Sequence, residues 1–212
     1  MRLTQVERTH VAEKRDFLDE LIDLQSDWRA LSDLPSSMVS SITGETERKV
    51  FNPADYKEKP FANSNRCLRV ASGREDVCSR CLEACPVHAV TIHNQSVLIG
   101  DDCRKCGLCA AVCPTETFST RRHTPRQVYD KIARAASAYE QCYVTCTRAL
   151  KRVPKENEVV LACVGAIPRD LWFSLLADYD NINVYLPVGI CDRCRTTTGE
   201  EVYTDAIGTA EE

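Results

Sequence analysis

The positions of the cysteines constrain this chain more than any other feature. Thirteen of its 212 residues are cysteine, none precedes Cys67, and eight lie between Cys67 and Cys113. The remaining five are Cys142, Cys146, Cys163, Cys191 and Cys194. An odd count, in a chain of this length without an apolar export signal at its start, does not fit a small secreted disulfide scaffold. The pattern favours thiols that bind metal in a reducing compartment, so we expect a cytoplasmic protein.

The overall composition excludes two classes of protein. A formal net charge of −4 argues against a general nucleic-acid binder, which would usually be basic. No apolar run approaches the roughly 20 residues that a membrane-spanning helix needs. With 43% hydrophobic residues, most of the chain has enough apolar side chains to form a folded core.

The cysteine-rich region contains an internal repeat. Three cysteines and a proline, from Cys78 to Pro86, recur 28 residues later from Cys106 to Pro114, and Cys103 precedes the second copy. The second copy therefore reads C-x2-C-x2-C-x3-C-P, the run that binds iron–sulfur clusters. Thiols three residues apart in a tight loop can reach successive corners of one cluster. Zinc ribbons use pairs of thiols without the third thiol and the trailing proline, so zinc is disfavoured here.

This repeat resembles the bacterial two-cluster [4Fe–4S] ferredoxin family over roughly residues 61–120. The resemblance implies that Cys103, Cys106 and Cys109 hold one cluster, with Cys85 from the other copy as its fourth ligand. It also implies that Cys78 and Cys81 hold the other cluster, with Cys113 as its fourth ligand. The cofactors expected from the family are thus two [4Fe–4S] clusters.

The first copy departs from the family pattern. The position three residues before Cys78 is Glu75, and the nearest thiol upstream is Cys67. Closing a loop of ten residues costs little more free energy than closing a short one, so we expect Cys67 to be the missing ligand. Two alternatives remain: a three-iron cluster that lacks this corner, or a non-thiol ligand such as Asp76.

We expect an α+β fold in which a two-cluster ferredoxin-like domain precedes a small α/β domain with a parallel sheet. The predicted boundaries are an N-terminal extension over residues 1–60, the ferredoxin-like domain over 61–122 and the α/β domain over 123–212. Between the two cysteine copies, residues 89–93 and 96–99 predict a hairpin with a two-residue turn.

The N-terminal extension contains one amphipathic pattern. Apolar residues recur at about 3.6-residue spacing, which predicts a helix near residues 11–31. The stretch over 32–66 carries several prolines and many polar residues, and it predicts an irregular connector. The apolar stripe of the helix either packs on the core of this protein or docks on a partner subunit.

The C-terminal region alternates helical and strand-like patterns. Helices are predicted from Thr124 through Tyr139, from Pro168 through Tyr179, and within residues 197–210. Strands are predicted over 141–146, 159–164 and 183–188, and the continuous apolar run of the second is typical of a buried parallel strand. If these strands are parallel, the cysteines at their carboxyl ends meet at one sheet edge, where open α/β sheets bind ligands.

That convergence suggests a third metal site. Its candidate ligands are Cys146, Cys163, Cys191 and Cys194, whereas Cys142 lies at the far end of its strand and is expected to be a plain buried thiol. A third [4Fe–4S] cluster is our first choice for the site and zinc is the second. A redox-active Cys191–Cys194 dithiol, or a set of ordinary core thiols, would also account for these cysteines.

The predicted function is electron transfer. The cysteines are expected to be ligands, the chain shows no catalytic motif, and we expect no catalysis of its own. The extra regions favour the ferredoxin-like subunit of an anaerobic oxidoreductase complex, whose larger partner carries a flavin, molybdenum or nickel–iron centre. The alternative is an accessory, maturation or redox-sensing iron–sulfur protein that uses the C-terminal cysteine site.

Overall fold

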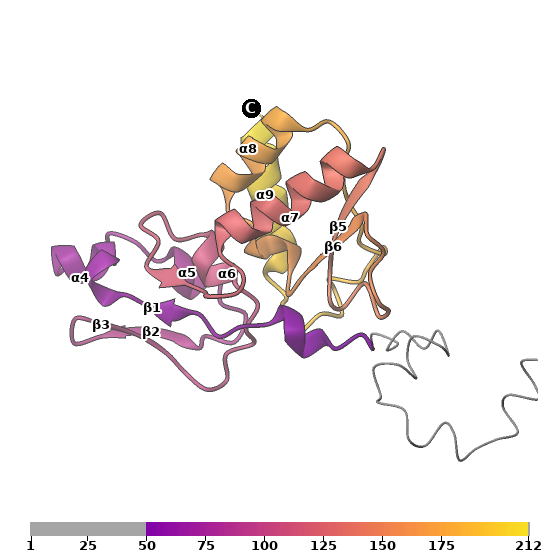
Figure 1. Cartoon of the computed structure of the whole chain (residues 1–212). Helices are drawn as coiled ribbons and strands as arrows, with labels where there is room; N and C mark the ends of the chain where they lie inside the picture. The colour runs from indigo at the N-terminus through magenta and orange to yellow at the C-terminus, as the bar shows by residue number, and fades with distance from the viewer. Residues whose placement is uncertain (1–49, 212) are drawn as a thin grey trace, which may run out of the picture. The chain divides into compact units, whose positions relative to one another are not determined.

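The computed structural model describes residues 50–211, in which helices accompany two antiparallel strand pairs and one parallel three-stranded sheet (Figure 1). The predicted helix near residues 11–31 lies outside the described residues. The secondary-structure elements of residues 50–211, with η for a 3-10 helix, are in chain order η1 Pro53–Tyr56, β1 Phe61–Ala62, η2 Ser64–Arg66, α4 Leu68–Ser72, α5 Arg80–Glu83, β2 Val90–His93, β3 Ser96–Ile99, α6 Leu108–Ala111, β4 Phe118–Ser119, α7 Pro125–Ala138, β5 Cys142–Cys146, β6 Glu158–Leu161, η3 Val164–Ala166, α8 Arg169–Asp178, β7 Ile182–Val184 and α9 Gly199–Glu211.

The cysteine repeat folds around two antiparallel strand pairs. β1 pairs with β4, and β2 pairs with β3 in the predicted hairpin. The two turn residues, Asn94 and Gln95, have φ values of 48° and 60°. Positive φ at both positions is the feature of the turn whose twist matches a two-residue hairpin. The short helices α5 and α6 begin 28 residues apart, so the sequence repeat is also a structural repeat.

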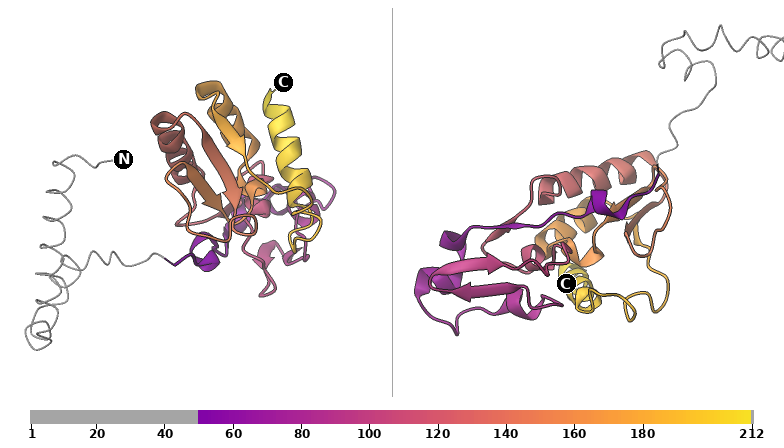
Figure 2. Two further views of the ribbon diagram at one scale, coloured as in Figure 1. Left: turned by 90° about the vertical axis from the view of Figure 1, so that its right-hand side faces the viewer. Right: turned by 90° about the horizontal axis from the view of Figure 1, so that it is seen from below.

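The C-terminal part contains the predicted parallel sheet, with strand order β6-β5-β7. Val144 on the central strand pairs with Val159 of β6 and with Val184 of β7, both in parallel. The strands and their covering helices appear from two further directions in Figure 2, with α9 in yellow at the C-terminal end.

Helix α7 forms where the sequence predicts it, because its start is capped twice. The Thr124 side chain accepts a hydrogen bond from the Gln127 N–H, and the Gln127 side chain accepts one from the Thr124 N–H. Pro125 occupies the first turn, where its missing N–H costs nothing. The buried face consists of the four residues expected from the periodicity: Val128, Ile132, Ala135 and Ala136.

Three local predictions need correction. The second strand ends at Leu161 rather than 164, because Val164 already begins the tight turn of η3. The third strand ends at Val184 rather than 188, shortly before Pro187, which has no N–H to donate to a sheet. The segment after Cys67 is not simply a loop: it forms α4, which ends at Gly73 with φ of 66°.

None of the helices in residues 50–211 combines the length and the apolar composition that a membrane span would need.

Candidate metal centres

Four cysteines from three segments line one small cavity of about 20 Å³. Cys67 and Cys81 are buried, while Cys78 and Cys113 are partly exposed. We call these residues the first thiol set. The other side chains around this cavity are mostly apolar and include Ile92 and Phe118. Cys113 belongs to the second sequence copy and lines this cavity with three thiols of the first region, which is the arrangement that a crossing of ligands would require.

A second cavity of about 20 Å³ is lined by Cys85, Cys103, Cys106 and Cys109. We call these residues the second thiol set. Here Cys85 comes from the first copy and meets three thiols of the second, so the crossing is reciprocal. The structure thus brings together the eight cysteines between Cys67 and Cys113 in two groups of four, the same groups that the ferredoxin resemblance implies once Cys67 is included.

The repeat extends from the sequence into the backbone around the two crossing cysteines. The Ala89 N–H donates to the Cys85 sulfur at 3.2 Å, and the Thr117 N–H donates to the Cys113 sulfur at 3.3 Å. Within each turn the preceding residue, His88 or Glu116, has a positive φ of 48° or 50°. These N–H groups stabilise negative charge on the sulfur, as a metal-bound thiolate requires.

Burial sets the proton affinity of the inner thiols. Loss of solvent, together with the nearby Cys113, Cys67 and Cys78, raises the pKa of Cys81 to about 11. Burial and neighbouring thiols also raise the pKa of Cys109 well above its ordinary value, and one of those neighbours is Cys81 of the first set. Without a positive partner these sulfurs would stay protonated, so a metal that replaces the protons is the natural complement to the two sets.

Cys113 shows the opposite balance. Partial burial raises its pKa, but hydrogen bonds from Thr117 and Thr115 outweigh that effect and lower the pKa below its ordinary value. The Thr115 hydroxyl lies 3.7 Å from the sulfur and also contacts the Thr117 hydroxyl at 3.3 Å. This environment favours a thiolate at the position that links the second sequence copy to the first thiol set.

The structure distinguishes the three candidates for the missing ligand of the first set. Cys67 lines the cavity with the other three thiols, and its side chain is buried. Asp76 is exposed and is held by Arg74 through contacts of 3.1 and 2.6 Å. Glu75 faces Arg69 at 3.8 Å. Geometry therefore favours Cys67 over Asp76 and over a cluster that lacks this corner.

The segments that carry the four C-terminal candidate ligands, which we call the third thiol set, are linked to one another beyond the carboxyl ends of the parallel strands. The ligands are Cys146 at the end of β5, Cys163 just before η3, and Cys191 and Cys194 in the loop after β7. The Arg148 guanidinium donates to the Arg193 carbonyl at 2.6 Å, which ties the end of β5 to the C-x2-C loop. The Thr147 N–H donates to the Leu161 carbonyl at 2.9 Å, which ties the same segment to β6.

The proton affinities of the third set reflect this arrangement. Burial raises the pKa of Cys163 to about 12, and the nearby thiols Cys106, Cys146 and Cys194 contribute to that increase. Burial, followed by Glu200 and the thiols Cys146 and Cys194, raises the pKa of Cys191 to about 11. The Thr196 N–H donates to the Cys194 sulfur at 3.5 Å. The third set thus resembles the first two in having mutually adjacent, partly desolvated thiols.

Cys142 differs from all three sets. It is fully buried in the core, and its thiol donates to the Ile132 carbonyl at 3.9 Å, as a protonated sulfur does. Burial alone raises its pKa. The structure therefore agrees with the expectation that Cys142 is a plain core thiol.

The donor chemistry of the first and second sets fits an iron–sulfur cluster. Within residues 50–211, no three cysteine, histidine, aspartate or glutamate side chains gather closely enough to hold one metal ion. In a [4Fe–4S] cluster each thiolate binds a different iron at a different corner, so the four sulfurs lie further apart than around one zinc. A donor set of four thiolates around a small cavity, with N–H groups aimed at sulfur, fits that cofactor.

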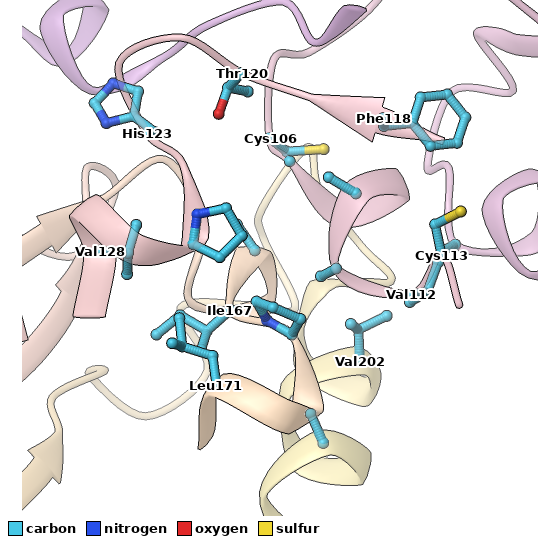
Figure 3. A pocket seen from close by; sticks show the side chains of 18 of the residues that line it. Cys106, Val112, Cys113, Phe118, Thr120, His123, Val128, Ile167, Leu171 and Val202 are labelled. Atoms are coloured by element: carbon cyan, nitrogen blue, oxygen red, sulfur yellow. The ribbon is translucent and has the colours of Figure 1, made fainter. Parts of the chain in front are cut away.

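A larger cavity of about 970 Å³ lies between α6, the start of α7, and helices α8 and α9 (Figure 3). Both Cys106 and Cys113 line it, so it adjoins the second and the first set. Its floor includes Val112, Ile167 and Val202. Burial and the nearby Lys131 lower the pKa of His123 at its rim, and the His123 Nε2 has no hydrogen-bond partner within the described structure.

Comparison with known proteins identifies the cysteine repeat. The family model of the 4Fe-4S dicluster domain matches residues 76–117. A ferredoxin of Methanothermococcus thermolithotrophicus is 35% identical over 46 residues, which are 21% of this chain and 77% of that protein. An uncharacterised ferredoxin of Methanocaldococcus jannaschii is 40% identical over 40 residues, 18% of this chain and 64% of that protein. No solved structure matches the chain significantly.

Sequence reasoning missed three kinds of residue around the sulfurs. The threonines at 115 and 117 are part of no motif, although Thr117 occupies the repeat position of Ala89 and could have been found from the 28-residue offset. The ties from Arg148 carry no sequence signal. The glycines at 165 and 199 belong to no glycine-rich motif, yet the absence of a side chain at each lets Leu108 and the Cys163 sulfur, respectively, approach closely.

Proposed function

Because this chain belongs to the ferredoxin family of iron–sulfur electron carriers, we propose that it relays single electrons through two [4Fe–4S] clusters held by the first and second thiol sets. The proposed ligands of one cluster are Cys67, Cys78, Cys81 and Cys113. The proposed ligands of the other are Cys85, Cys103, Cys106 and Cys109. Each bound cluster would accept and release one electron.

The observation that carries this proposal is the separation of eight thiols into two groups of four around two cavities. The protein contributes three things at these sites. Its loops fix the thiols, the N–H groups of Ala89 and Thr117 stabilise charge on two sulfurs, and apolar neighbours such as Phe118 limit solvent access.

We further propose that Cys67 is the fourth ligand of the cluster held by the first thiol set. Cys67 lies outside the matched family region, which begins at residue 76. The support is the burial of Cys67 beside the first cavity and the exposure of Asp76. Helix α4 starts at the next residue, and its short rise per residue reduces the span of the inserted segment between Cys67 and Cys78. Cys67 can thus complete the first thiol set although it is eleven residues before Cys78 rather than the usual three.

The experiment for the two-cluster proposal is a count of iron and acid-labile sulfide on the full chain after anaerobic purification and reconstitution. At least about eight of each per chain is expected, with a reduced state that is paramagnetic. Cys81→Ala should remove the first cluster, whereas Cys142→Ala, a substitution of a buried thiol outside the sets, should leave the count unchanged. A colourless protein without sulfide would refute the function.

We propose that this carrier acts in the cytoplasm as a subunit of an anaerobic oxidoreductase complex. Reduced thiols are typical of that compartment, and the matched relatives cover only about a fifth of the chain, which leaves two further regions for other contacts. The partner would be a larger redox subunit with a flavin, molybdenum or nickel–iron centre. A partner that bound in the large cavity would lie close to Cys106 of the second set and Cys113 of the first, because both residues line it.

Complex formation can be tested separately from cluster binding. Deletion of residues 1–31, which contain the predicted amphipathic helix, should abolish co-purification of a redox subunit and leave the iron content unchanged. Loss of iron on that deletion would contradict a docking role. An intact chain that carries its clusters and purifies without any partner from its native source would favour a free carrier instead.

We also propose a metal centre at the third thiol set. The support is that the four thiols lie on the segments that follow three neighbouring parallel strands, with the C-x2-C loop tied by a hydrogen bond from Arg148 to the segment after β5. The same iron and sulfide count tests its presence, because a third four-iron cluster would bring the total to about twelve.

A further inference from the structure

The third thiol set is packed against the second through an unusually close contact between η3 and α6. A Cβ added at Gly107 would lie 2.8 Å from the Ala166 Cβ. A Cβ added at Gly165 would lie 2.7 Å from the Leu108 Cδ2. Such distances are shorter than real side-chain contacts, so each glycine sits where no larger residue fits. Cys163 immediately precedes η3, and Cys109 lies within α6.

A second contact joins the C-terminal cysteine loop to the same region. The Thr198 hydroxyl donates to the Ala84 carbonyl at 2.7 Å, and Ala84 directly precedes Cys85 of the second set. On the other side, a Cβ added at Gly199 would lie 2.8 Å from the Cys163 sulfur. The start of α9 therefore contacts both sets, and only a residue without a side chain fits at its first position.

The packing of the first set on the second completes this order. Cys67 and Cys81 of the first set share one buried cluster with Cys85 and Cys109 of the second, whereas the contacts at Gly165 and Thr198 place the segments of the third set against the second. The second set thus has a neighbour on each side.

We propose that the third thiol set holds a third iron–sulfur cluster, and that the packing of η3 on α6 holds it beside the second set, so that the three sets form a row with the second in the middle. This inference rests on the proposed two-cluster function and extends it. Transfer of one electron from a low-potential one-electron donor would leave that donor oxidised and a centre at one end reduced. Each later transfer along the row would reoxidise one centre as its neighbour is reduced. No bond is formed or broken in the protein.

The row makes specific demands on the residues that separate the sets. The glycines at 107, 165 and 199 have to remain small, because a side chain at any of them would displace α6, η3 or the Cys163 sulfur. The hydrogen bond from the Thr198 hydroxyl to the Ala84 carbonyl fixes the start of α9 against the second set. Gly208, in the same helix α9, has nothing within 4 Å of an added Cβ and provides a matched control.

The first test is the iron and sulfide content of the full-length protein. The wild type should carry about twelve irons, and a Cys191→Ala/Cys194→Ala variant should carry about eight. Cys142→Ala should keep about twelve. About eight irons in both the wild type and the double variant would overturn the third cluster while leaving the two-cluster function intact. Eight irons and one zinc in the wild type would also overturn it. Far fewer than eight in the wild type would refute the proposed function itself.

A second variant keeps the test decisive if the double substitution unfolds the C-terminal region. Gly199→Ala forces a methyl group against the Cys163 sulfur and should lower the content below about twelve irons, toward eight, whereas Gly208→Ala should leave it unchanged. Equal iron in these two variants would contradict the placement of Cys163 at the third cluster.

The order of the row is tested by electron paramagnetic resonance of the dithionite-reduced protein. If the third centre adjoins the second, the wild-type spectrum should contain magnetic interaction that the double variant lacks, and the remaining signals should saturate at lower microwave power after its removal. A wild-type spectrum equal to the sum of the double-variant spectrum and one isolated cluster would overturn the proposed adjacency.

Discussion

Gly165→Ala probes whether the contact between η3 and α6 is as close as the structure indicates. The new Cβ would lie 2.7 Å from the Leu108 Cδ2 and 2.8 Å from the Gly199 carbonyl oxygen. Ordinary contact begins near 3.4 Å, so two neighbours would have to withdraw by at least about 0.6 Å. Leu108 is fully buried, and the carbonyl belongs to the backbone, so neither group can turn away into solvent.

Overpacking of this kind costs about 1–3 kcal/mol, and the loss of backbone freedom in the unfolded chain returns about 0.4–1 kcal/mol. The net destabilisation should be about 1–2 kcal/mol. Gly165 has no positive φ, so the substitution adds crowding without backbone strain. Gly208→Ala, which meets no neighbour within 4 Å in helix α9, should instead stabilise the protein by about 0.5–1 kcal/mol.

The assay is anaerobic urea unfolding followed by circular dichroism. With a slope of about 2 kcal/mol per molar urea, the Gly165→Ala midpoint should fall by about 0.5–1 M, and the Gly208→Ala midpoint should rise by about 0.3–0.5 M. Equal midpoints for the two variants would mean that η3 and α6 pack more loosely than these distances imply, and the case for adjacent thiol sets would lose its main support.

Four other outcomes follow from the same structure. Cys67→Ala should lower the iron content, whereas Asp76→Ala should not, and iron analysis compares the two. Cys142→Ala should cost about 1 kcal/mol of stability in urea unfolding, because it leaves a void of about one methyl group. Thr198→Val should cost about 1 kcal/mol through the lost bond to the Ala84 carbonyl. The hydrogen bond from Arg152 lowers the pKa of Glu158, so its stabilisation is present above the ordinary glutamate pKa and is lost as pH falls through the lowered value. Glu158→Gln should therefore lower the thermal midpoint at pH 7, with a smaller difference from wild type as the pH falls below 4.5.

The sequence predicted most of what depends on local patterns. The crossing of Cys85 and Cys113 between two thiol sets follows from a spacing of three and four residues, because a loop that wraps one cluster cannot also reach its own trailing cysteine. The parallel sheet followed from the continuous apolar run at 159–164 and the helical patterns between the strands. The Thr124-Pro125 pair predicted the start of α7. These features depend on residues close together in the chain.

The remaining features depend on distant partners. The length of β6 is limited by η3, whose position is set by packing of Gly165 against Leu108 and Gly199, residues far apart in sequence. Helix α4 is only five residues long, which is too short for an apolar period to predict. The bond between Arg148 and the Arg193 carbonyl joins an exposed side chain to a loop backbone, and neither end has a sequence signature. Tertiary packing, rather than propensity, decided each of these features.

The two copies of the repeat differ where the C-terminal part meets only one of them. Ser79 and Arg80 of the first copy correspond to Gly107 and Leu108 of the second, 28 residues later. Arg80 is exposed, whereas Leu108 is fully buried beneath Gly165. Gly107 has φ of 87°, a conformation that favours glycine, and its missing side chain admits Ala166. An isolated two-cluster domain would not need this asymmetry, because both copies would face solvent alike. The second copy therefore packs against the segment that follows Cys163, whereas the first copy has the exposed Arg80 at the equivalent position.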